Sequence, residues 1–354
     1  PVRGSAFRIR IAFMGTGLLL SMWISNTATA AILIPIFLGT LPKEDENSAG
    51  SLLTIAYACS VGGLGTLVGS PPNSITVRLL QEQAGIEVDF VEWMGLGLTA
   101  SIVLLIAIAV TMHFRAPLPR LESDVHYVAT PWSRGERVTA FCFCLAVAGW
   151  MIPGLMHAMH APQAEAVVKA LPIGAVAIFA SAPLFLLLEQ DGETPVLPWS
   201  DAVRIDWGLI LLFGGGLSLG AQMFETGLAN EIGHWFLAAS GIDSRWGLTT
   251  ALIVFTIFFT EACSNTASAT MLVPLAIAAS TELGVSPLPP SLAVGLAASC
   301  AFMLPIATGP NAVVFGTGKV SLPAMIRTGF VLNIVAALTL LAVLRIFGLA
   351  FAWE

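Results

Sequence analysis

Residues 25–36 read SNTATAAILIPI and residues 264–275 read SNTASATMLVPL, so one polar tripeptide opens the same apolar pattern twice, 239 residues apart. A second motif follows each copy, GSPPN at 69–73 and ATGPN at 307–311. Two motifs in the same order at nearly the same spacing indicate an internal duplication. The chain is therefore predicted to contain two structural repeats, each with a Ser-Asn-Thr segment set in apolar sequence.

Composition identifies the solvent in which the chain folds. Hydrophobic residues make up 56% of the sequence and charged residues only 10%, and the mean hydropathy is +0.85. A soluble domain carries about 25% charged residues, so this composition predicts a membrane protein. We expect an all-α, multi-pass protein of the cell (inner) membrane, because helices satisfy their own backbone groups in lipid. Uncharged runs of spanning length support this, at 95–112, 138–156, 170–188 and 207–224.

The first repeat is predicted to contain a re-entrant hairpin and a discontinuous helix. The hairpin occupies 6–41, where two apolar arms flank the polar tripeptide. The next segment, 49–83, has the length of one long helix, but glycines and the pair Pro71-Pro72 interrupt it. Irregular backbone at membrane depth is tolerated only where protein or a water-filled cavity surrounds it. A span at 93–114 completes this part, which we take as residues 1–114.

A polar connector and a second repeat complete the predicted organisation. Residues 115–137, which carry four arginines, are expected to form an interfacial connector on the cytoplasmic side. The second repeat, 138–354, again contains a re-entrant hairpin, at 246–282, and a discontinuous helix, at 290–320. Its other spans are predicted at 138–158, 166–188, 205–226 and 323–350.

The number of crossings between the hairpins sets their relative orientation. An odd number makes the second hairpin open to the opposite face, which gives the inverted repeat of alternating-access secondary transporters. With the first hairpin opening to the cytoplasm, 11 of the 15 Lys and Arg residues lie inside, as the positive-inside rule requires. Five crossings are predicted, at 49–83, 93–114, 138–158, 166–188 and 205–226.

The duplication also predicts that helices are missing before the first hairpin. Three spans precede the second hairpin within its repeat, whereas almost nothing precedes the first. By the offset of 239, the counterpart of Val138 would lie about 100 residues before Pro1. We therefore expect the first repeat to be N-terminally incomplete and to lack scaffold helices.

The two polar tips offer a defined chemistry. A helix that starts at such a tip has unpaired backbone N–H groups and the positive end of its dipole, and Ser, Asn and Thr add neutral donors. These groups suit a carboxylate or another oxyanion. The interrupted helices present carbonyl oxygens, which suit a hard monovalent cation such as Na⁺. Two tips that meet at the midplane would form two anion-binding sets, so a dianion is the expected ligand.

These motifs resemble the paired signatures of the divalent anion:sodium symporter family, which carries di- and tricarboxylates or sulfate. The resemblance rests on both SNT segments together with the GSPPN and ATGPN loops, and it extends over essentially the whole chain. In that family the SNT residues contact substrate. The resemblance therefore implies a substrate site formed by Ser25, Asn26, Thr27, Ser264, Asn265 and Thr266, with Thr308 from the second loop.

The resemblance also implies two Na⁺ sites, each combining a tip with its facing loop. Ser21 and Thr260 obey the offset of 239, so the sequence independently pairs them. The second loop departs from the usual Pro-Pro-Asn of the family at Gly309. One implied site comprises Ser21, Asn26, Gly65 and Gly69, and the other Thr260, Asn265, Ala307 and Gly309.

Glu261 is an ionisable residue three positions before the second tip, and its counterpart in the first repeat is Met22. An ionisable group in a membrane segment is a functional candidate by default. It can equally hydrogen-bond the backbone around the tip, and this structural interpretation is favoured. The five cysteines all lie in apolar segments and are interpreted as packing residues rather than a metal site.

Together these features predict a sodium-coupled symporter, not an enzyme, that imports a dicarboxylate such as succinate, malate or fumarate with two or more Na⁺ ions. Two alternatives stay open: the same fold carrying sulfate or another inorganic dianion, and a Na⁺-independent dicarboxylate exchanger. A membrane enzyme would need a nucleophile, base or metal cluster, and the sequence contains none. An anion channel would need a continuous pore, and the predicted inverted hairpins argue against one. The expected partners are a small dianion, the lipid bilayer and a second copy in a homodimer, with no nucleic acid.

Overall fold

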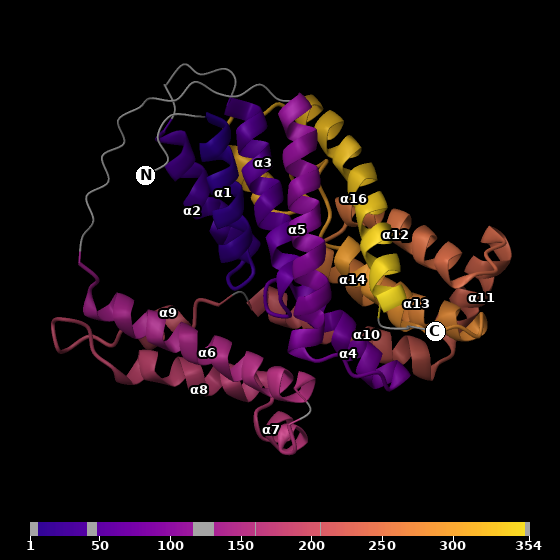
Figure 1. The fold of residues 1–354 in the computed structure, drawn as a ribbon, viewed down its shortest axis with the longest axis horizontal. Coiled ribbons are helices and arrows are strands. Elements are labelled where there is room, and N and C mark those ends of the chain that lie inside the picture. Colours follow the sequence, from indigo (N-terminus) through magenta and orange to yellow (C-terminus); the bar gives the residue numbers. More distant parts are fainter. Residues whose placement is uncertain (1–5, 41–47, 116–130, 160, 206, 351–354) are drawn as a thin grey trace. The chain divides into compact units, whose positions relative to one another are not determined.

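The computed structural model describes residues 6–40, 48–115, 131–159, 161–205 and 207–350. Within these ranges the regular structure is helical apart from one isolated β-bridge, so the predicted all-α class is confirmed (Figure 1). The elements are α1 (Ala6–Ser21), α2 (Asn26–Leu38), α3 (Ser48–Gly62), the 3₁₀ turn η1 (Gly63–Gly65), α4 (Pro71–Ala84), α5 (Phe90–Arg115), α6 (Arg134–Ala158), α7 (Ala164–Ala170), α8 (Ile173–Leu186), α9 (Trp199–Ala202), α10 (Trp207–Glu225), α11 (Leu228–Ser240), α12 (Arg245–Ala262), α13 (Asn265–Glu282), α14 (Leu288–Ala297), α15 (Gly309–Gly316) and α16 (Leu322–Ala350).

The chain divides into two compact units, and each is described here by itself. The larger unit contains both Ser-Asn-Thr segments and both interrupted helices. It comprises Pro1–Val88, Trp93–Val125 and Leu211–Glu354, whereas the smaller comprises Asp89–Glu92 and His126–Ile210. Most of the predicted connector, residues 116–130, lies outside the described residues.

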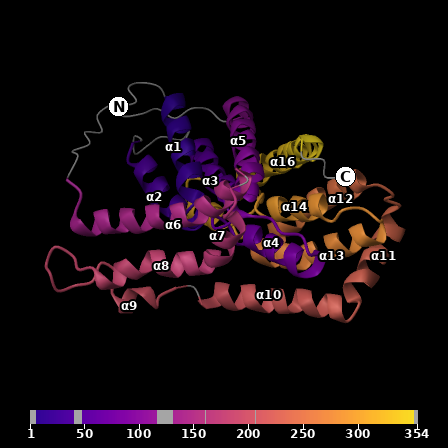
Figure 2. The ribbon, with the colours of Figure 1, turned by 60° about the horizontal axis from the view of Figure 1, so that its bottom comes forward.

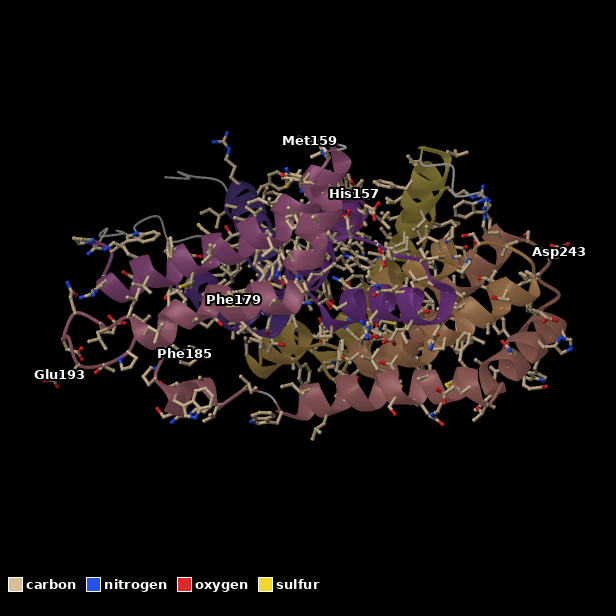
Figure 3. The ribbon with its side chains drawn as sticks, turned by 90° about the horizontal axis from the view of Figure 1, so that it is seen from below. His157, Met159, Phe179, Phe185, Glu193 and Asp243 are labelled. Carbon is tan, nitrogen blue, oxygen red and sulfur yellow. The ribbon has the colours of Figure 1, made fainter. Side chains whose placement is uncertain are left out.

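The smaller unit is built on α6 and α8, which lie side by side (Figure 2). Trp150 on α6 donates its indole N–H to Ile173 O (3.0 Å) at the start of α8. Figure 3 shows His157 and Met159 at the end of α6 and Glu193 in the loop that follows α8. Many apolar side chains of this unit are exposed, as expected of a surface that faces lipid rather than water; they include Phe141, Ile178, Phe179 and Leu186.

The predicted single span at 166–188 is wrong as a continuous helix, because the structure divides it into α7 and α8. Pro172 is the N-cap residue of α8 and Leu171 is the C-cap residue of α7. Proline lacks a backbone N–H and disfavours helical geometry in the residue before it, so the helix ends at this point.

In the larger unit, α3 is the central element of the first repeat. Of residues 48–65, 89% are buried, and both α1 and α2 pack against α3. The helix stops at Gly62, and the carbonyl oxygens freed at this break find donors on α5. Ser101 Oγ donates to Val61 O (2.7 Å) and Trp93 Nε1 donates to Leu64 O (3.0 Å). The break is therefore satisfied by protein groups, as irregular backbone in lipid requires.

Side-chain contacts connect the two repeats across this core. The Tyr57 hydroxyl of α3 donates to Phe302 O (2.9 Å), and the two rings meet edge to face. The hydroxyls of Ser70 and Ser299 lie 3.0 Å apart. Helix α4 packs on α13 and α14, so each interrupted helix supports elements of the other repeat.

Four described helices are long and apolar enough to cross a membrane, and a fifth candidate is the bent pair α11 and α12, which meet at 100°. The four are Ser48–Gly65, Phe90–Arg115, Arg134–His157 and Leu322–Leu349. Helices of this kind are expected of a multi-pass protein of the cell membrane, which the composition predicts. Shorter apolar helices of 10–17 residues are also present, among them α2, α8 and α14.

Replacing Tyr57 by Phe should lower the free energy of unfolding by about 1–3 kcal/mol, because it leaves Phe302 O buried without its donor. Thermal unfolding of purified protein in detergent measures the effect. As a control, Thr226→Val removes an exposed hydroxyl that bonds only its own helix, and the change should stay within about 0.5 kcal/mol. Equal stability of Tyr57→Phe and the wild type would show that this hydrogen bond does not join the repeats.

Candidate functional site

The two Ser-Asn-Thr segments lie at the starts of equivalent helices. Ser25 is the N-cap residue of α2 and accepts a hydrogen bond from Ala28 N (3.2 Å). Ser264 is the N-cap residue of α13 and accepts one from Ala267 N (3.1 Å). A serine that caps a helix in this way fixes where the helix begins. Each tip therefore presents a helix N-terminus, with its partial positive charge, beside the Asn and Thr side chains.

A hydroxyl on the preceding helix contacts each tip asparagine. In the first repeat, Ser21 Oγ lies 2.6 Å from Asn26 Oδ1 and 2.6 Å from Cys59 O. A hydroxyl has one proton, so it cannot donate fully to both oxygens at once. The three oxygens therefore converge with too few protons between them.

The second repeat contains the same arrangement. Thr260 Oγ1 lies 3.0 Å from Asn265 Oδ1 and 2.8 Å from Ala298 O. Each of these residues lies 239 positions after its counterpart in the first repeat. The duplication seen in the sequence is therefore also a duplication of hydrogen-bond geometry.

A second asparagine fixes each loop, and here the structure adds residues that were not among the predicted site residues. Asn73 Nδ2 donates to Gly63 O (2.8 Å) and Thr66 O (2.7 Å). In the other repeat, Asn311 Nδ2 donates to Ala301 O (3.1 Å) and Leu304 O (3.0 Å). The signal was present, because these asparagines end the two repeated motifs GSPPN and ATGPN.

The other side-chain atom of each loop asparagine has a different environment. Asn73 Oδ1 and Asn311 Oδ1 are buried, and no donor reaches either of them among the described residues. Because both donor groups of each amide are already used, the oxygen cannot gain a partner by rotating the amide. A buried oxygen of this kind is normally satisfied by a donor, a water or a cation.

In the predicted first cation set, backbone oxygens pack closely around Gly69. A Cβ placed on Gly69 would lie 2.6 Å from Gly63 O, 2.9 Å from Met22 O and 3.1 Å from Ser21 O. Three carbonyl oxygens thus approach one point that only glycine leaves open. Gly65, the fourth predicted member, lies against the Met22 side chain. The structure therefore places Gly69 beside the Ser21 backbone and Gly65 beside the Met22 side chain.

In the second predicted cation set, no hydrogen bond among the described residues joins Ala307 or Gly309 to Thr260 or Asn265. Ala307 is buried in the loop, and its N–H donates to Leu304 O (3.2 Å). Gly309 begins α15 and lies so close to Thr27 that a Cβ would overlap the threonine side chain. The second loop is thereby placed against the first tip, which brings parts of both repeats together.

The predicted substrate residues differ in exposure. Ser25, Thr27 and Ser264 are exposed, and the two tip asparagines are half-buried. Thr266 and Thr308 are buried, and Thr308 caps α15 by accepting a hydrogen bond from Asn311 N (3.3 Å). Among the described residues no hydrogen bond joins the two tips directly, and the Gly309–Thr27 contact joins the second loop to the first tip.

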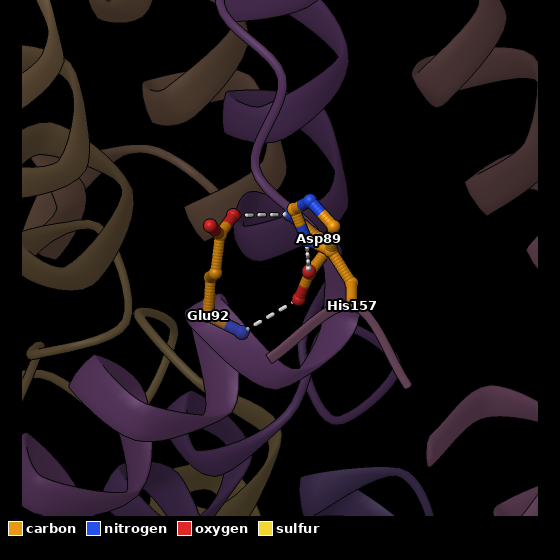
Figure 4. A group of neighbouring side chains, drawn as sticks. All are labelled: Asp89, Glu92 and His157. Atoms are coloured by element: carbon orange, nitrogen blue, oxygen red, sulfur yellow. Dashed lines mark hydrogen bonds and ion pairs between the residues drawn. The ribbon is translucent and has the colours of Figure 1, made fainter. Parts of the chain in front are cut away.

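A cluster of Asp89, Glu92 and His157 in the smaller unit has ligand atoms within 4.8 Å of one another (Figure 4). Its two carboxylates already cap the N-terminus of α5. Asp89 Oδ1 accepts from Glu92 N (2.8 Å), and Glu92 Oε2 accepts from Asp89 N (2.9 Å). His157 Nδ1 lies 3.3 Å from the other Asp89 oxygen. This reciprocal capping explains the cluster without a metal ion.

The sequence matches known transporters over almost its entire length. Residues 2–295 and 168–353 match the family described as citrate transporter. The sodium-dependent dicarboxylate transporter SdcS of Staphylococcus saprophyticus is 33% identical, and the match covers 96% of this chain and 69% of that protein. SdcS of Staphylococcus aureus is 32% identical over 97% of this chain and 69% of its own length. An uncharacterised transporter of Haemophilus influenzae is 34% identical over 96% of this chain and 72% of its length.

These matches agree with the doubled SNT motif and its paired loops, on which the sequence-based expectation rested. The chain belongs to the divalent anion:sodium symporter family.

Proposed function

We propose that this protein is a sodium-coupled symporter that carries dicarboxylates such as succinate, malate or fumarate across the cell membrane. The observation that carries the proposal is the duplicated hydroxyl–asparagine contact, in which three oxygens share one proton at each tip. The sequence relatives named as sodium-dependent dicarboxylate transporters support the choice of ion and substrate class.

The tips are suited to a dianion. Each offers backbone N–H groups at a helix N-terminus and neutral Ser, Asn and Thr donors, and none of the tip or loop motifs contains Lys or Arg. A carboxylate can bind to such a set reversibly, since no fixed opposite charge holds it. The proposed substrate ligands are Ser25, Asn26, Thr27, Ser264, Asn265, Thr266 and Thr308.

The oxygens behind each tip are suited to Na⁺. The crowded oxygens around Ser21 and Thr260, and the carbonyls beside Gly69, form neutral, oxygen-rich sets of the kind that hard cations prefer. When bound, two or more Na⁺ ions would supply the positive charge that the tips lack beside a dianion. The proposed ligands are Ser21, Asn26, Gly65 and Gly69 in the first repeat and Thr260, Asn265, Ala307 and Gly309 in the second.

The proposed mechanism is alternating access through an inverted repeat. α1 with α2 and α12 with α13 would form two re-entrant hairpins that open to opposite faces, and the interrupted helices would complete the two binding sets. Residues 1–114 and 138–354 would be the two repeats, joined by the connector 115–137, and two copies would form a homodimer. The sulfate transporter and the sodium-independent exchanger are the competing functions.

Uptake by proteoliposomes tests the function. With labelled succinate outside, an inward Na⁺ gradient should drive accumulation above equilibrium, whereas a K⁺ gradient should not. Excess unlabelled malate or fumarate should compete, and excess sulfate should not. Competition by sulfate alone would favour the inorganic dianion, and succinate exchange that is equal in Na⁺ and K⁺ would favour the exchanger.

Thr27→Ala and Thr266→Ala test the substrate ligands. Each removes one neutral donor, so succinate affinity should fall roughly 2- to 13-fold, equivalent to about 0.5–1.5 kcal/mol. Binding of succinate to purified protein at saturating Na⁺ measures the effect, and Thr226→Val at an exposed helix end serves as the control. Wild-type affinity in both tip variants would remove the tips from the substrate site.

The inverted topology predicts which loops lie on which side. In a variant without the five native cysteines, Asp243→Cys should react with an impermeant maleimide from outside the cell. Glu193→Cys, in the exposed loop after α8, should react only after the membrane is opened. If both cysteines react from the same side, the odd number of crossings is wrong and the repeats are not inverted.

A further inference from the structure

Glu261 is a buried carboxylate at the second tip, in the last turn of α12, and its side chain is only 5% exposed. It is followed within three residues by Ser264, the N-cap residue of α13. The equivalent residue in the first repeat is Met22, which carries no charge. The two otherwise matching tips therefore differ by one ionisable side chain.

The Glu261 carboxylate accepts hydrogen bonds from backbone N–H groups of the non-helical segment between α14 and α15. Phe302 N and Met303 N donate to Oε1 at 2.7 and 2.8 Å, and Leu304 N donates to Oε2 at 3.0 Å. The side-chain amide of Asn333, which is fully buried on α16, also donates to Oε1 (2.9 Å). Three consecutive N–H groups that would otherwise lack partners are thus satisfied by one side chain.

All of these donors are neutral, so they stabilise the charge without cancelling it. In the described part of the chain, no Lys, Arg or His forms an ion pair with Glu261. Buried charges in proteins are normally paired with an opposite charge or coordinate a metal. The balancing positive charge is therefore expected from something that binds.

The segment between α14 and α15, which Glu261 contacts, is also hydrogen-bonded to the loop of the proposed second cation site. Thr260, the preceding residue, supplies the hydroxyl that crowds Asn265 Oδ1. Leu304, whose N–H is held by the carboxylate, accepts hydrogen bonds through its carbonyl from Asn311 Nδ2 (3.0 Å) and Ala307 N (3.2 Å). The charge and the proposed cation ligands thus belong to one bonded network.

We propose that Glu261 is the fixed negative charge and positioning residue of the second cation site, balanced by the Na⁺ that binds there. The first site, with Met22 in this position, has no such charge. The two sites are therefore unequal: the second binds Na⁺ more tightly and fills first. This inference rests on the proposed Na⁺ coupling and adds to it an order of ion binding.

Glu261→Gln tests the inference, because it removes the charge and keeps the length of the side chain. Thermal unfolding of purified protein at increasing Na⁺, with ionic strength held by K⁺, gives the Na⁺ concentration that produces half of the stabilisation. This concentration should rise at least about tenfold in Glu261→Gln. Glu282→Gln removes the same charge from an exposed position on the next helix, and its value should stay within about twofold of the wild type.

The outcomes separate this inference from the proposed function. A wild-type protein that Na⁺ does not stabilise would contradict the sodium coupling itself. Wild-type stabilisation by Na⁺ with an unchanged half-point in Glu261→Gln would overturn the role of Glu261 and leave the symporter intact. A variant that is less stable at every Na⁺ concentration, with the same half-point, would show a purely structural residue.

If Glu261→Gln does not fold, the conservative variant Glu261→Asp replaces it. Infrared difference spectra of the wild type, recorded in Na⁺ and in K⁺, should contain a carboxylate stretching band that responds to Na⁺. That band should change frequency in Glu261→Asp, because the responding carboxylate has changed. An identical band in both proteins would assign the response to another residue and overturn the proposal.

Discussion

Backbone that leaves a helix inside the membrane must find hydrogen-bond partners in the protein, and the rest of this structure depends on that constraint. Each repeat has two such places, the start of the Ser-Asn-Thr helix and the break in the helix that follows. The serine caps the first, and a loop asparagine ties together the second. Once the necessary bonds are made, only a few oxygens are left without donors. Two of those oxygens, Asn73 Oδ1 and Asn311 Oδ1, belong to the loops that carry proposed ion ligands, so the same irregularity shapes the backbone and the proposed site.

The two repeats satisfy the backbone groups at their helix breaks in different ways. At the first break, neutral side chains of α5 donate to the freed carbonyl oxygens. At the second, the Glu261 carboxylate accepts from the freed N–H groups, and the Tyr57 hydroxyl donates to Phe302 O. The two repeats thus share the hydroxyl–asparagine geometry but differ in one ionisable side chain, Met22 against Glu261. Under the proposed sodium coupling, this difference would give the two ion sites unequal affinity and a defined order of loading.

Much of this could be predicted from the sequence, because repetition and composition are local signals. The doubled SNT segments gave the family, and the apolar composition gave the all-helical class. The pairing of Ser21 with Thr260 also followed from the offset of 239 residues, and both hydroxyls contact their tip asparagines in the structure.

Other features depend on contacts between residues far apart in the chain and could not be predicted from the sequence. The partners of Glu261 lie 41 to 43 and 72 positions away along the chain, so no local pattern identifies them. The loop asparagines were visible in the repeated motifs, but the carbonyls that they hold depend on the path of an irregular loop. The division at Pro172 had a local signal, and the continuous apolar run around it outweighed that signal in the prediction.

The central claim is that ion and substrate bind to sites that share Asn26 and Asn265, so each must raise the affinity of the other by the same factor. Equilibrium binding of succinate measured over a range of Na⁺ concentrations, together with Na⁺ binding measured over a range of succinate concentrations, tests this directly. Succinate affinity should rise steeply with Na⁺, and the reciprocal experiment should give the same coupling factor. Succinate affinity that is the same in Na⁺ and in K⁺ would contradict the account.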